Sequence, residues 1–163
     1  MKRFAVIGLG KFGFHVAKTL YEEGHEVIAI DNEKARVQDI GEHCTEAILL
    51  DAKNKDRLLP LGLESMDSVV VSTGTSVSTS IMISLYLKEI GVEHILVKAL
   101  DEDHAKILLR VGATEIVQPE KEMAVKVAKG LSTPNILDFI PLEEDYSMVQ
   151  ISPPPPFLGK TLK

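Results

Sequence analysis

Tryptophan is absent from this chain of 163 residues, and aromatic side chains make up only 5% of it. Hydrophobic residues nevertheless account for 45% of the chain, so the core must be built mainly from aliphatic side chains. Such a composition is typical of α/β proteins. The length suits one well-buried domain and argues against two full ones.

Cysteine is almost absent too, since Cys44 is the single one. One cysteine excludes an internal disulfide framework and any Cys-rich zinc site. The five histidines show no metal-ligand spacing, and no serine nucleophile motif accompanies them. Cys44 has no lysine or arginine close to it in the sequence, so we expect a small buried side chain rather than a nucleophile.

The chain also lacks long apolar runs and clustered positive charge. No apolar stretch reaches 18 residues and no signal peptide is evident, which predicts a soluble cytoplasmic protein without direct membrane insertion. Any membrane role would then come through a partner. The net charge is −6, and Lys and Arg are scattered, which argues against nucleic acid as a main partner.

A glycine motif near the start is the strongest signal in the chain. An apolar run at residues 4–7 predicts a buried strand, followed by Gly8, Gly10 and Gly13 before a helix begins. In a dinucleotide-binding loop the first glycine permits the tight turn, the second admits a pyrophosphate, and the third lets the helix pack closely. The helix N-terminus then favours the phosphates. Three glycines also make ordinary turns. The nucleotide interpretation is supported by Asp31, an acidic residue about 20 residues beyond the glycine motif.

Apolar runs and helical patterns alternate along the next hundred residues. The expected strands span residues 4–7, 26–31, 47–51, 68–72, 94–98 and 115–118. The expected helices span residues 11–23, 33–42, 55–59, 81–90 and 102–111. This alternation predicts an α/β fold, a Rossmann-like doubly wound parallel sheet with strand order 3-2-1-4-5-6.

The remainder of the chain does not continue this alternation. We expect a helix at residues 119–131, a short helix at 134–140 and an extra strand at 146–151. A four-proline run at 153–156 then forms an edge or a spacer. We therefore divide the chain into a nucleotide-binding domain (3–133), a crossover helix and strand (134–151), and a proline linker that leads into an absent C-terminal lobe (152–163).

Two aspartates are expected at the carboxyl ends of strands, where such sheets bind ligands. Asp31 closes the second strand, where a carboxylate accepts hydrogen bonds from ribose hydroxyls and repels a 2′-phosphate. Asp51 closes the third strand and would reach the base or the ribose. Strand-end aspartates are also common turn residues, so a purely structural role remains the alternative for both.

Other polar residues fall on the same predicted edge of the sheet. Lys11 lies inside the glycine loop, where its charge would face the phosphates, although a solvated lysine is the alternative. Thr73, Gly74 and Ser76 follow the fourth strand and would present hydroxyl and N–H groups, or simply cap the next helix. Lys98 ends the fifth strand.

These features resemble the RCK domain, also called the TrkA N-terminal domain, of potassium transport regulators, and within it the KtrA-like subfamily. The similarity covers about residues 3–151. It is carried by residues 4–13 (FAVIGLGKFG), 24–27 (GHEV), 51–52 (DA), 97–99 (VKA), 111–113 (VGA) and 119–123 (PEKEM). A Rossmann dehydrogenase has no reason to share the later stretches.

The resemblance implies a cytoplasmic regulatory subunit that binds ATP or ADP, or NAD(H) in TrkA-like relatives, and gates a membrane potassium-translocating subunit. It implies homodimers that assemble into a ring, an octamer, at the inner face of the membrane, with helices after strand six crossing between subunits. It also implies that Glu120 lies near the phosphates and a divalent cation at the dimer interface. Lys11 replaces the arginine that is usual in KtrA-type proteins, and Ser76 replaces asparagine or aspartate.

The motif and the resemblance together predict one nucleotide site and no catalytic residue. The predicted site comprises Gly8, Gly10, Lys11, Phe12, Gly13, Asp31, Asp51, Ala52, Thr73, Gly74, Ser76, Lys98 and Glu120, with Glu120 also a metal ligand. The leading hypothesis is therefore a nucleotide sensor that is not an enzyme. The alternatives are a small NAD-dependent oxidoreductase, for which no general acid or base is evident, and a redox-sensing NAD module, which would need a basic DNA-recognition helix.

Overall fold

The computed structural model describes residues 1–73, 76–132, 136–143 and 146–151, with side chains described up to residue 132. It divides into two compact units, residues 1–118 and 119–163, which we describe separately. None of the helices in the described part of the chain has both the length and the apolar character that a membrane span requires.

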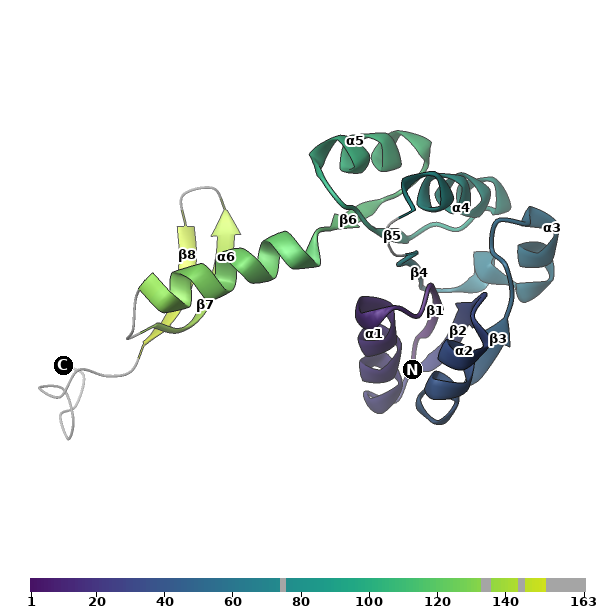
Figure 1. Ribbon diagram of the computed structural model, residues 1–163, viewed down its shortest axis with the longest axis horizontal. Coiled ribbons are helices and arrows are strands. Elements are labelled where there is room, and N and C mark those ends of the chain that lie inside the picture. The colour runs from purple at the N-terminus through teal and green to yellow at the C-terminus, as the bar shows by residue number, and fades with distance from the viewer. Residues whose placement is uncertain (74–75, 133–135, 144–145, 152–163) are drawn as a thin grey trace, which may run out of the picture. The chain divides into compact units, whose positions relative to one another are not determined.

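The first unit is a parallel sheet of six strands in the order β3-β2-β1-β4-β5-β6, which confirms the predicted order (Figure 1). Its strands are β1 (Arg3–Ile7), β2 (Glu26–Asp31), β3 (Glu46–Leu49), β4 (Ser68–Val71), β5 (Ile95–Lys98) and β6 (Glu115–Val117). Its α-helices are α1 (Lys11–Glu22), α2 (Lys34–Ile40), α3 (Lys55–Leu58), α4 (Val77–Ile90) and α5 (Glu102–Val111). Short 3₁₀ helices follow α2 and α3: η1 (Gly41–His43), η2 (Leu59–Leu61) and η3 (Leu63–Ser65).

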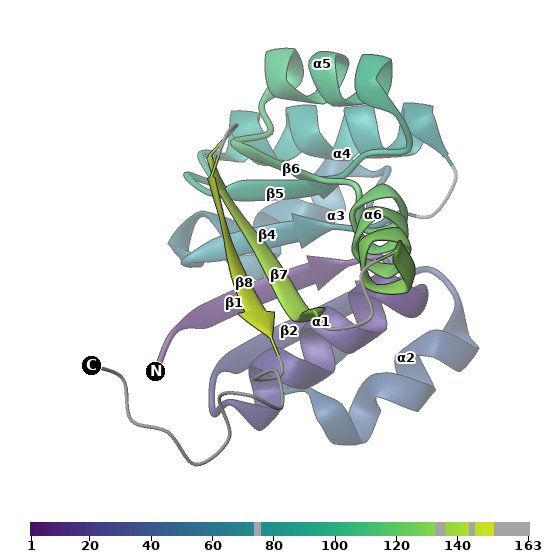
Figure 2. The same cartoon turned by 90° about the vertical axis from the view of Figure 1, so that its left-hand side faces the viewer.

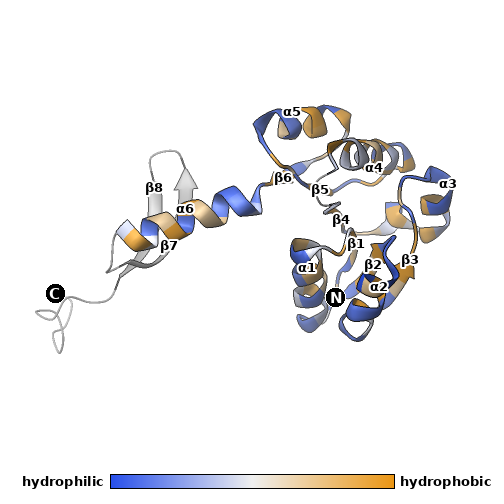
Figure 3. Cartoon of the chain, viewed as in Figure 1, coloured by the Kyte–Doolittle hydropathy of each residue, from blue (hydrophilic) through white to orange (hydrophobic). Residues whose placement is uncertain are grey.

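Helices cover both faces of this sheet. Because neighbouring residues of a strand point to opposite faces, each strand contributes side chains to the core on both sides. α1 and α2 lie on one face, and α4 and α5 lie on the other (Figure 2). Val6 belongs to the core cluster on the α1 side, whereas Ala5 and Ile7 belong to the larger cluster beneath α4 and α5. The strands are accordingly rich in apolar residues, with charged residues mainly at their ends. The helices mix apolar with hydrophilic residues (Figure 3).

Two boundaries differ from the prediction in ways that affect the site. Helix α4 begins at Val77 rather than at residue 81, because the side chain of Ser76 caps it by accepting from the N–H of Thr79. The Ser/Thr-rich sequence there favours loop conformations, which hid the first turn. Strand β3 ends at Leu49, so Asp51 lies two residues beyond the strand and not at its end.

The second unit consists of α6 (Pro119–Ser132) and an antiparallel pair, β7 (Ile136–Glu143) and β8 (Tyr146–Ile151). The predicted helix and the extra strand at 146–151 are present. The short helix predicted at 134–140, which was to serve as the crossover helix, is wrong: the described residues 136–140 belong to β7. Isoleucine and phenylalanine favour strands, and Pro141 would end a helix within two turns. The proline run and the predicted linker at 152–163 lie outside the described residues.

Candidate functional site

The turn after β1 depends on two glycines whose missing side chains leave room for backbone. Gly8 has a φ of +96°, in the region that favours glycine. A Cβ on Gly8 would collide with the carbonyl oxygen of Ser72 after β4, and one on Gly13 would collide with the carbonyl oxygen of Gly8. The tight turn and the close packing of α1 that the motif predicts are therefore both present.

Gly10 differs from the other two glycines of the motif. A Cβ built on Gly10 would meet no atom of the described chain within 4 Å, so the packing of the protein does not require a glycine here. Gly10 is the N-cap residue of α1, and no side chain of the described residues caps this helix. The first turn of α1 contains no acidic residue either. Within the described residues the first N–H groups of α1 thus lack a side-chain acceptor, which is the state in which a helix N-terminus can bind an anion.

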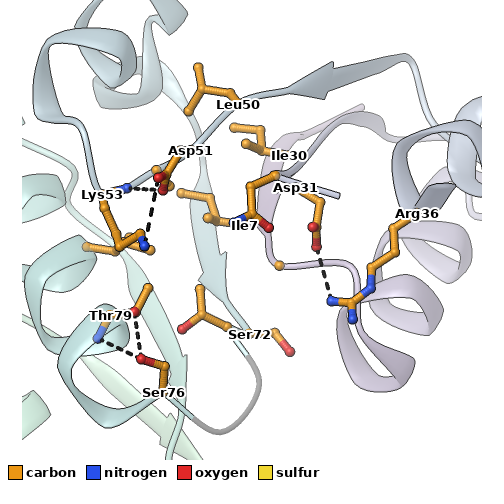
Figure 4. A pocket seen from close by; sticks show the side chains of 15 residues that line it. Ile7, Ile30, Asp31, Arg36, Leu50, Asp51, Lys53, Ser72, Ser76 and Thr79 are labelled. Carbon is orange, nitrogen blue, oxygen red and sulfur yellow. Dashed lines mark hydrogen bonds and ion pairs between the residues drawn. The ribbon is translucent and has the colours of Figure 1, made fainter. Parts of the chain in front are cut away.

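A pocket of about 420 Å³ lies beside this turn at the carboxyl ends of the strands (Figure 4). It lies where strand order reverses between β1 and β4, the usual ligand position in such sheets. Six of the predicted site residues line it: Gly8, Asp31, Asp51, Ala52, Thr73 and Ser76. Its remaining lining consists of the apolar residues Ile7, Ile30, Leu50 and Ile83 and the polar residues Asn32, Arg36, Lys53, Ser72 and Thr79. Of these polar residues, the sequence did not single out Asn32, Arg36, Lys53 or Thr79.

Asp31 is buried in the wall of the pocket, with 5% of its surface exposed. Its Oδ2 accepts a hydrogen bond from the N–H of Leu9 at 2.6 Å, and its Oδ1 accepts one from the N–H of Glu33 at 2.8 Å. The carboxylate thus ties the glycine loop to the start of α2. Each carboxylate oxygen can accept a second hydrogen bond, so capacity for ribose hydroxyls remains.

Arg36 reaches the same carboxylate from α2. Its Nη1 lies 3.6 Å from Oδ2 of Asp31, and its Nε lies 2.9 Å from a carboxylate oxygen of Glu33. The two partners of Arg36 differ in environment, because the Asp31 side chain is buried and the Glu33 side chain is 53% exposed. Arg36 lies five residues after Asp31, near the start of the helix that follows β2. Its short distance from Asp31 in the sequence is the feature that could have indicated a place near the pocket.

The opposite wall of the pocket is built by the β4–α4 connection. The Oγ1 of Thr73 is buried, and among the described residues it has no hydrogen-bond partner. Such an orphaned hydroxyl is costly unless a ligand or water satisfies it. Ser76 and Thr79 lie close by, with their hydroxyl oxygens 2.7 Å apart.

Asp51 lies at the far end of the pocket, in the turn after β3. Its Oδ1 accepts from the N–H of Lys53 at 3.0 Å, and the Nζ of Lys53 lies 3.8 Å from Oδ2. The side chain of Asp51 is only half buried, so its structural turn role and a contact with a ligand are compatible.

The remaining predicted residues do not line the pocket. Gly10 is the N-cap of α1, and Lys11, Phe12 and Gly13 belong to the first turn of that helix. Lys98 ends β5, and Glu120 lies in α6, in the second unit. Gly74 lies outside the described residues.

Neither metal-site nor thiol chemistry is evident in the described part of the chain. No group of three or more His, Cys, Asp or Glu side chains there is placed to hold a metal ion. Cys44 is buried, and burial raises the pKa of its thiol, with Glu46 adding to the effect. It is therefore a core side chain rather than a thiolate nucleophile.

These observations fit a nucleotide. Open space at Gly10 and an uncapped helix suit phosphates, a buried carboxylate suits ribose hydroxyls, and the orphaned hydroxyl of Thr73 suits a polar ligand group.

The model of the TrkA-N domain matches residues 4–119 of this chain. The chain belongs to the TrkA-N domain family. The Ktr system potassium uptake protein A of Bacillus subtilis is 40% identical over 150 residues, which cover 92% of this chain and 68% of that protein. The Ktr system potassium uptake protein C of the same organism is 40% identical over 161 residues, covering 99% of this chain and 73% of that protein. These relatives confirm the resemblance to KtrA.

Solved structures support the same fold assignment for this TrkA-N family member. The TrkA-N domain of the inner membrane protein YbaL from Escherichia coli superposes with a TM-score of 0.70 at 19% identity, covering 80% of this chain and 96% of that one. The GsuK channel bound to NAD superposes with a TM-score of 0.66 at 12% identity, covering 75% of this chain and 22% of the GsuK chain. GsuK bound to ADP superposes with a TM-score of 0.64 at 22% identity, covering 80% of this chain and 33% of the GsuK chain. The likeness confirms the Rossmann-like fold.

Proposed function

We propose that this chain is the nucleotide-sensing part of a regulatory subunit that controls a membrane potassium transporter. The observation that carries the proposal is the uncapped N-terminus of α1 beside a 420 Å³ pocket at the switch point of the sheet. Relatives named as potassium uptake proteins supply the biological setting. The ligand is ATP or ADP, with NAD(H) as the alternative, since GsuK has been solved with both ADP and NAD.

The parts of the nucleotide are assigned to different walls of the site. The phosphates lie on the N–H groups of the first turn of α1, near the ammonium of Lys11, with Gly10 leaving them room. The ribose lies at Asp31, and the base reaches toward Asp51 and Ala52. The hydroxyl of Thr73 gains the partner that it lacks within the described residues.

Assembly involves a second copy of the chain through α6. Three apolar side chains spaced four residues apart on this helix are exposed: Met123 (58%), Val127 (52%) and Leu131 (80%). Val125 on the same helix is exposed as well, at 46%. Exposed apolar side chains of this kind support burial of the helix against another subunit. Glu120 would then lie near the phosphates and a divalent cation at the dimer interface. Lys98, at the end of β5, is proposed as a further contact of the nucleotide. The dimers form a ring, an octamer, at the cytoplasmic face of the membrane.

Control of the transporter requires that nucleotides favour one arrangement of the assembly. A ligand shifts an equilibrium only by the difference between its affinities for the two states. ATP and ADP differ by one phosphate, so Lys11, Lys98 and Glu120 are the residues where that difference would arise. The pocket binds nucleotide without chemical conversion, since no catalytic residue is assigned to it.

Native mass spectrometry of the freshly purified protein tests the proposal directly. We expect oligomers that carry an adenine nucleotide mass on each chain, and removal of the nucleotide should shift the distribution of oligomers. Bare monomers that remain bare after addition of ATP, ADP and NADH would contradict the proposal.

A further inference from the structure

The three charged side chains Asp31, Glu33 and Arg36 form one cluster that is connected by ion pairs. Figure 4 shows the pair formed by Asp31 and Arg36, which both line the pocket. We propose that Glu33, by holding the guanidinium of Arg36, is a specificity-determining residue that restricts the pocket to nucleotides with a free ribose 2′-hydroxyl. The inference rests on the proposed function, because it concerns the same pocket.

The position of the cluster indicates which part of a nucleotide it faces. Arg36 and Asp31 both line the pocket, with Nη1 of Arg36 3.6 Å from Oδ2 of Asp31. In sheets of this topology the acid at the end of the second strand faces the ribose hydroxyls, and an arginine beside it can accommodate a 2′-phosphate. The guanidinium of Arg36 therefore lies where a 2′ substituent would project.

The charges of the cluster then decide what the pocket accepts. A free guanidinium would attract a phosphate through its fork of N–H donors. Glu33 occupies the Nε of Arg36 at 2.9 Å, and Asp31 faces Nη1, so one positive charge serves two carboxylates. The cluster carries a net charge of about −1, because two carboxylates share one guanidinium. A ribose hydroxyl can donate to Asp31 there, whereas a 2′-phosphate meets repulsion.

Glu33 is the member of the cluster that keeps Arg36 from a phosphate. Both side chains are about half exposed, at 53% for Glu33 and 46% for Arg36, so either can be replaced without disturbing the core. Glu33→Gln removes the charge that holds Arg36, whereas Arg36→Gln removes the only cation of the cluster. The exposed Lys34 on the same helix is not a pocket residue, and Lys34→Gln makes the same charge change as Arg36→Gln.

The test measures the affinities of the full chain for 5′-AMP and adenosine 2′,5′-bisphosphate, which differ only in the 2′-phosphate. We expect the wild type to prefer 5′-AMP. In Glu33→Gln the preference should shift toward the bisphosphate by about three- to fivefold, as for a half-exposed charge contact, and in Arg36→Gln it should shift the other way. Lys34→Gln should keep the wild-type ratio.

Three results would overturn the inference. An unchanged ratio in Glu33→Gln, with 5′-AMP still bound, would remove Glu33 and Arg36 from selectivity and leave the proposed function intact. An equal loss of both ligands in Arg36→Gln would place Arg36 on the base or the 5′-phosphate instead. If the wild type binds neither ligand, nor ATP, ADP or NADH, the proposed function fails and this inference fails with it.

Discussion

At the scale of single residues, the three glycines of the loop have separable roles. A Cβ at position 13 would collide with the backbone carbonyl of Gly8, whereas a Cβ at position 10 would meet nothing within 4 Å. The motif therefore combines structural glycines with one that the fold itself does not need.

Alanine substitution should separate these roles in the ligand-free protein. Gly13→Ala should lower the free energy of unfolding by about 1–3 kcal/mol or more, because backbone must shift to admit the methyl group. Gly10→Ala should change it by less than about 1 kcal/mol, since a poorer N-cap is partly offset by a less flexible unfolded chain. Urea unfolding measures both, and equal losses would contradict the distinction.

Asp31 has a structural role that the sequence could not reveal, beside the ribose contact that we propose for it. Its position after an apolar run was enough to predict an acid at this edge of the sheet, where it lines the pocket. Its hydrogen bonds to the N–H groups of Leu9 and Glu33 depend on how the loops meet in three dimensions. Arg36 escaped prediction for the same reason, since its importance comes from its distance to Asp31 rather than from a motif.

We expect Asp31→Ala to reduce stability as well as binding. Loss of the carboxylate leaves two N–H groups without their acceptor and should cost about 1–3 kcal/mol in the free energy of unfolding. If Asp31 also binds ribose, the affinity for ATP should fall more than the affinity for inorganic tripolyphosphate, which has no ribose. Calorimetric titration compares the two ligands, and equal losses would show that Asp31 acts only by positioning the glycine loop.

At the scale of secondary structure elements, the alternation of apolar strands and helices was sufficient to predict the order of the sheet. Boundaries that depend on side-chain capping were not predictable, as the early start of α4 at Val77 shows. The failure at β7 has another cause. A strand of a two-stranded pair is defined by its partner, and short apolar segments do not distinguish helix from strand.

Helices α4 and α5 are joined by a buried histidine. The Nδ1 of His104 accepts a hydrogen bond from the N–H of Leu100 at 3.2 Å, so the ring is neutral and its Nε2 donates to Ser80 Oγ at 2.9 Å. Burial lowers the pKa of His104 below its ordinary value of 6.5, with Asp101 opposing the shift. Ser80 lies one turn after the Ser76 cap, so this bond supports the helix that lines the pocket.

This histidine should make stability depend on pH. The unfolded chain binds the proton more readily than the native state, so the contribution of His104 is complete above pH 6.5 and declines as the pH falls below it. Between pH 7.5 and 5.5, we expect the wild type to lose more stability in urea unfolding than His104→Asn, which does not titrate. The difference should not exceed about 1.4 kcal/mol per pH unit. Parallel pH profiles would contradict this account.

At the scale of the whole molecule, the chain consists of a pocket-bearing unit and a second unit that begins with α6. The composition and the glycine motif were sufficient to predict the class of the first unit. The proposed function assigns the exposed apolar residues of α6 to a contact with a second copy of the chain, which a sequence pattern alone does not specify.

The central claim is that the glycine loop holds an adenine nucleotide, and chemical unfolding with and without ADP tests it most directly. At 100 times its dissociation constant, ADP should raise the free energy of unfolding of the wild type by about 2.7 kcal/mol. Gly10→Val should fold but gain little from ADP, because its side chain occupies the space left for the phosphates. No gain for the wild type, or an equal gain for Gly10→Val, would contradict the claim.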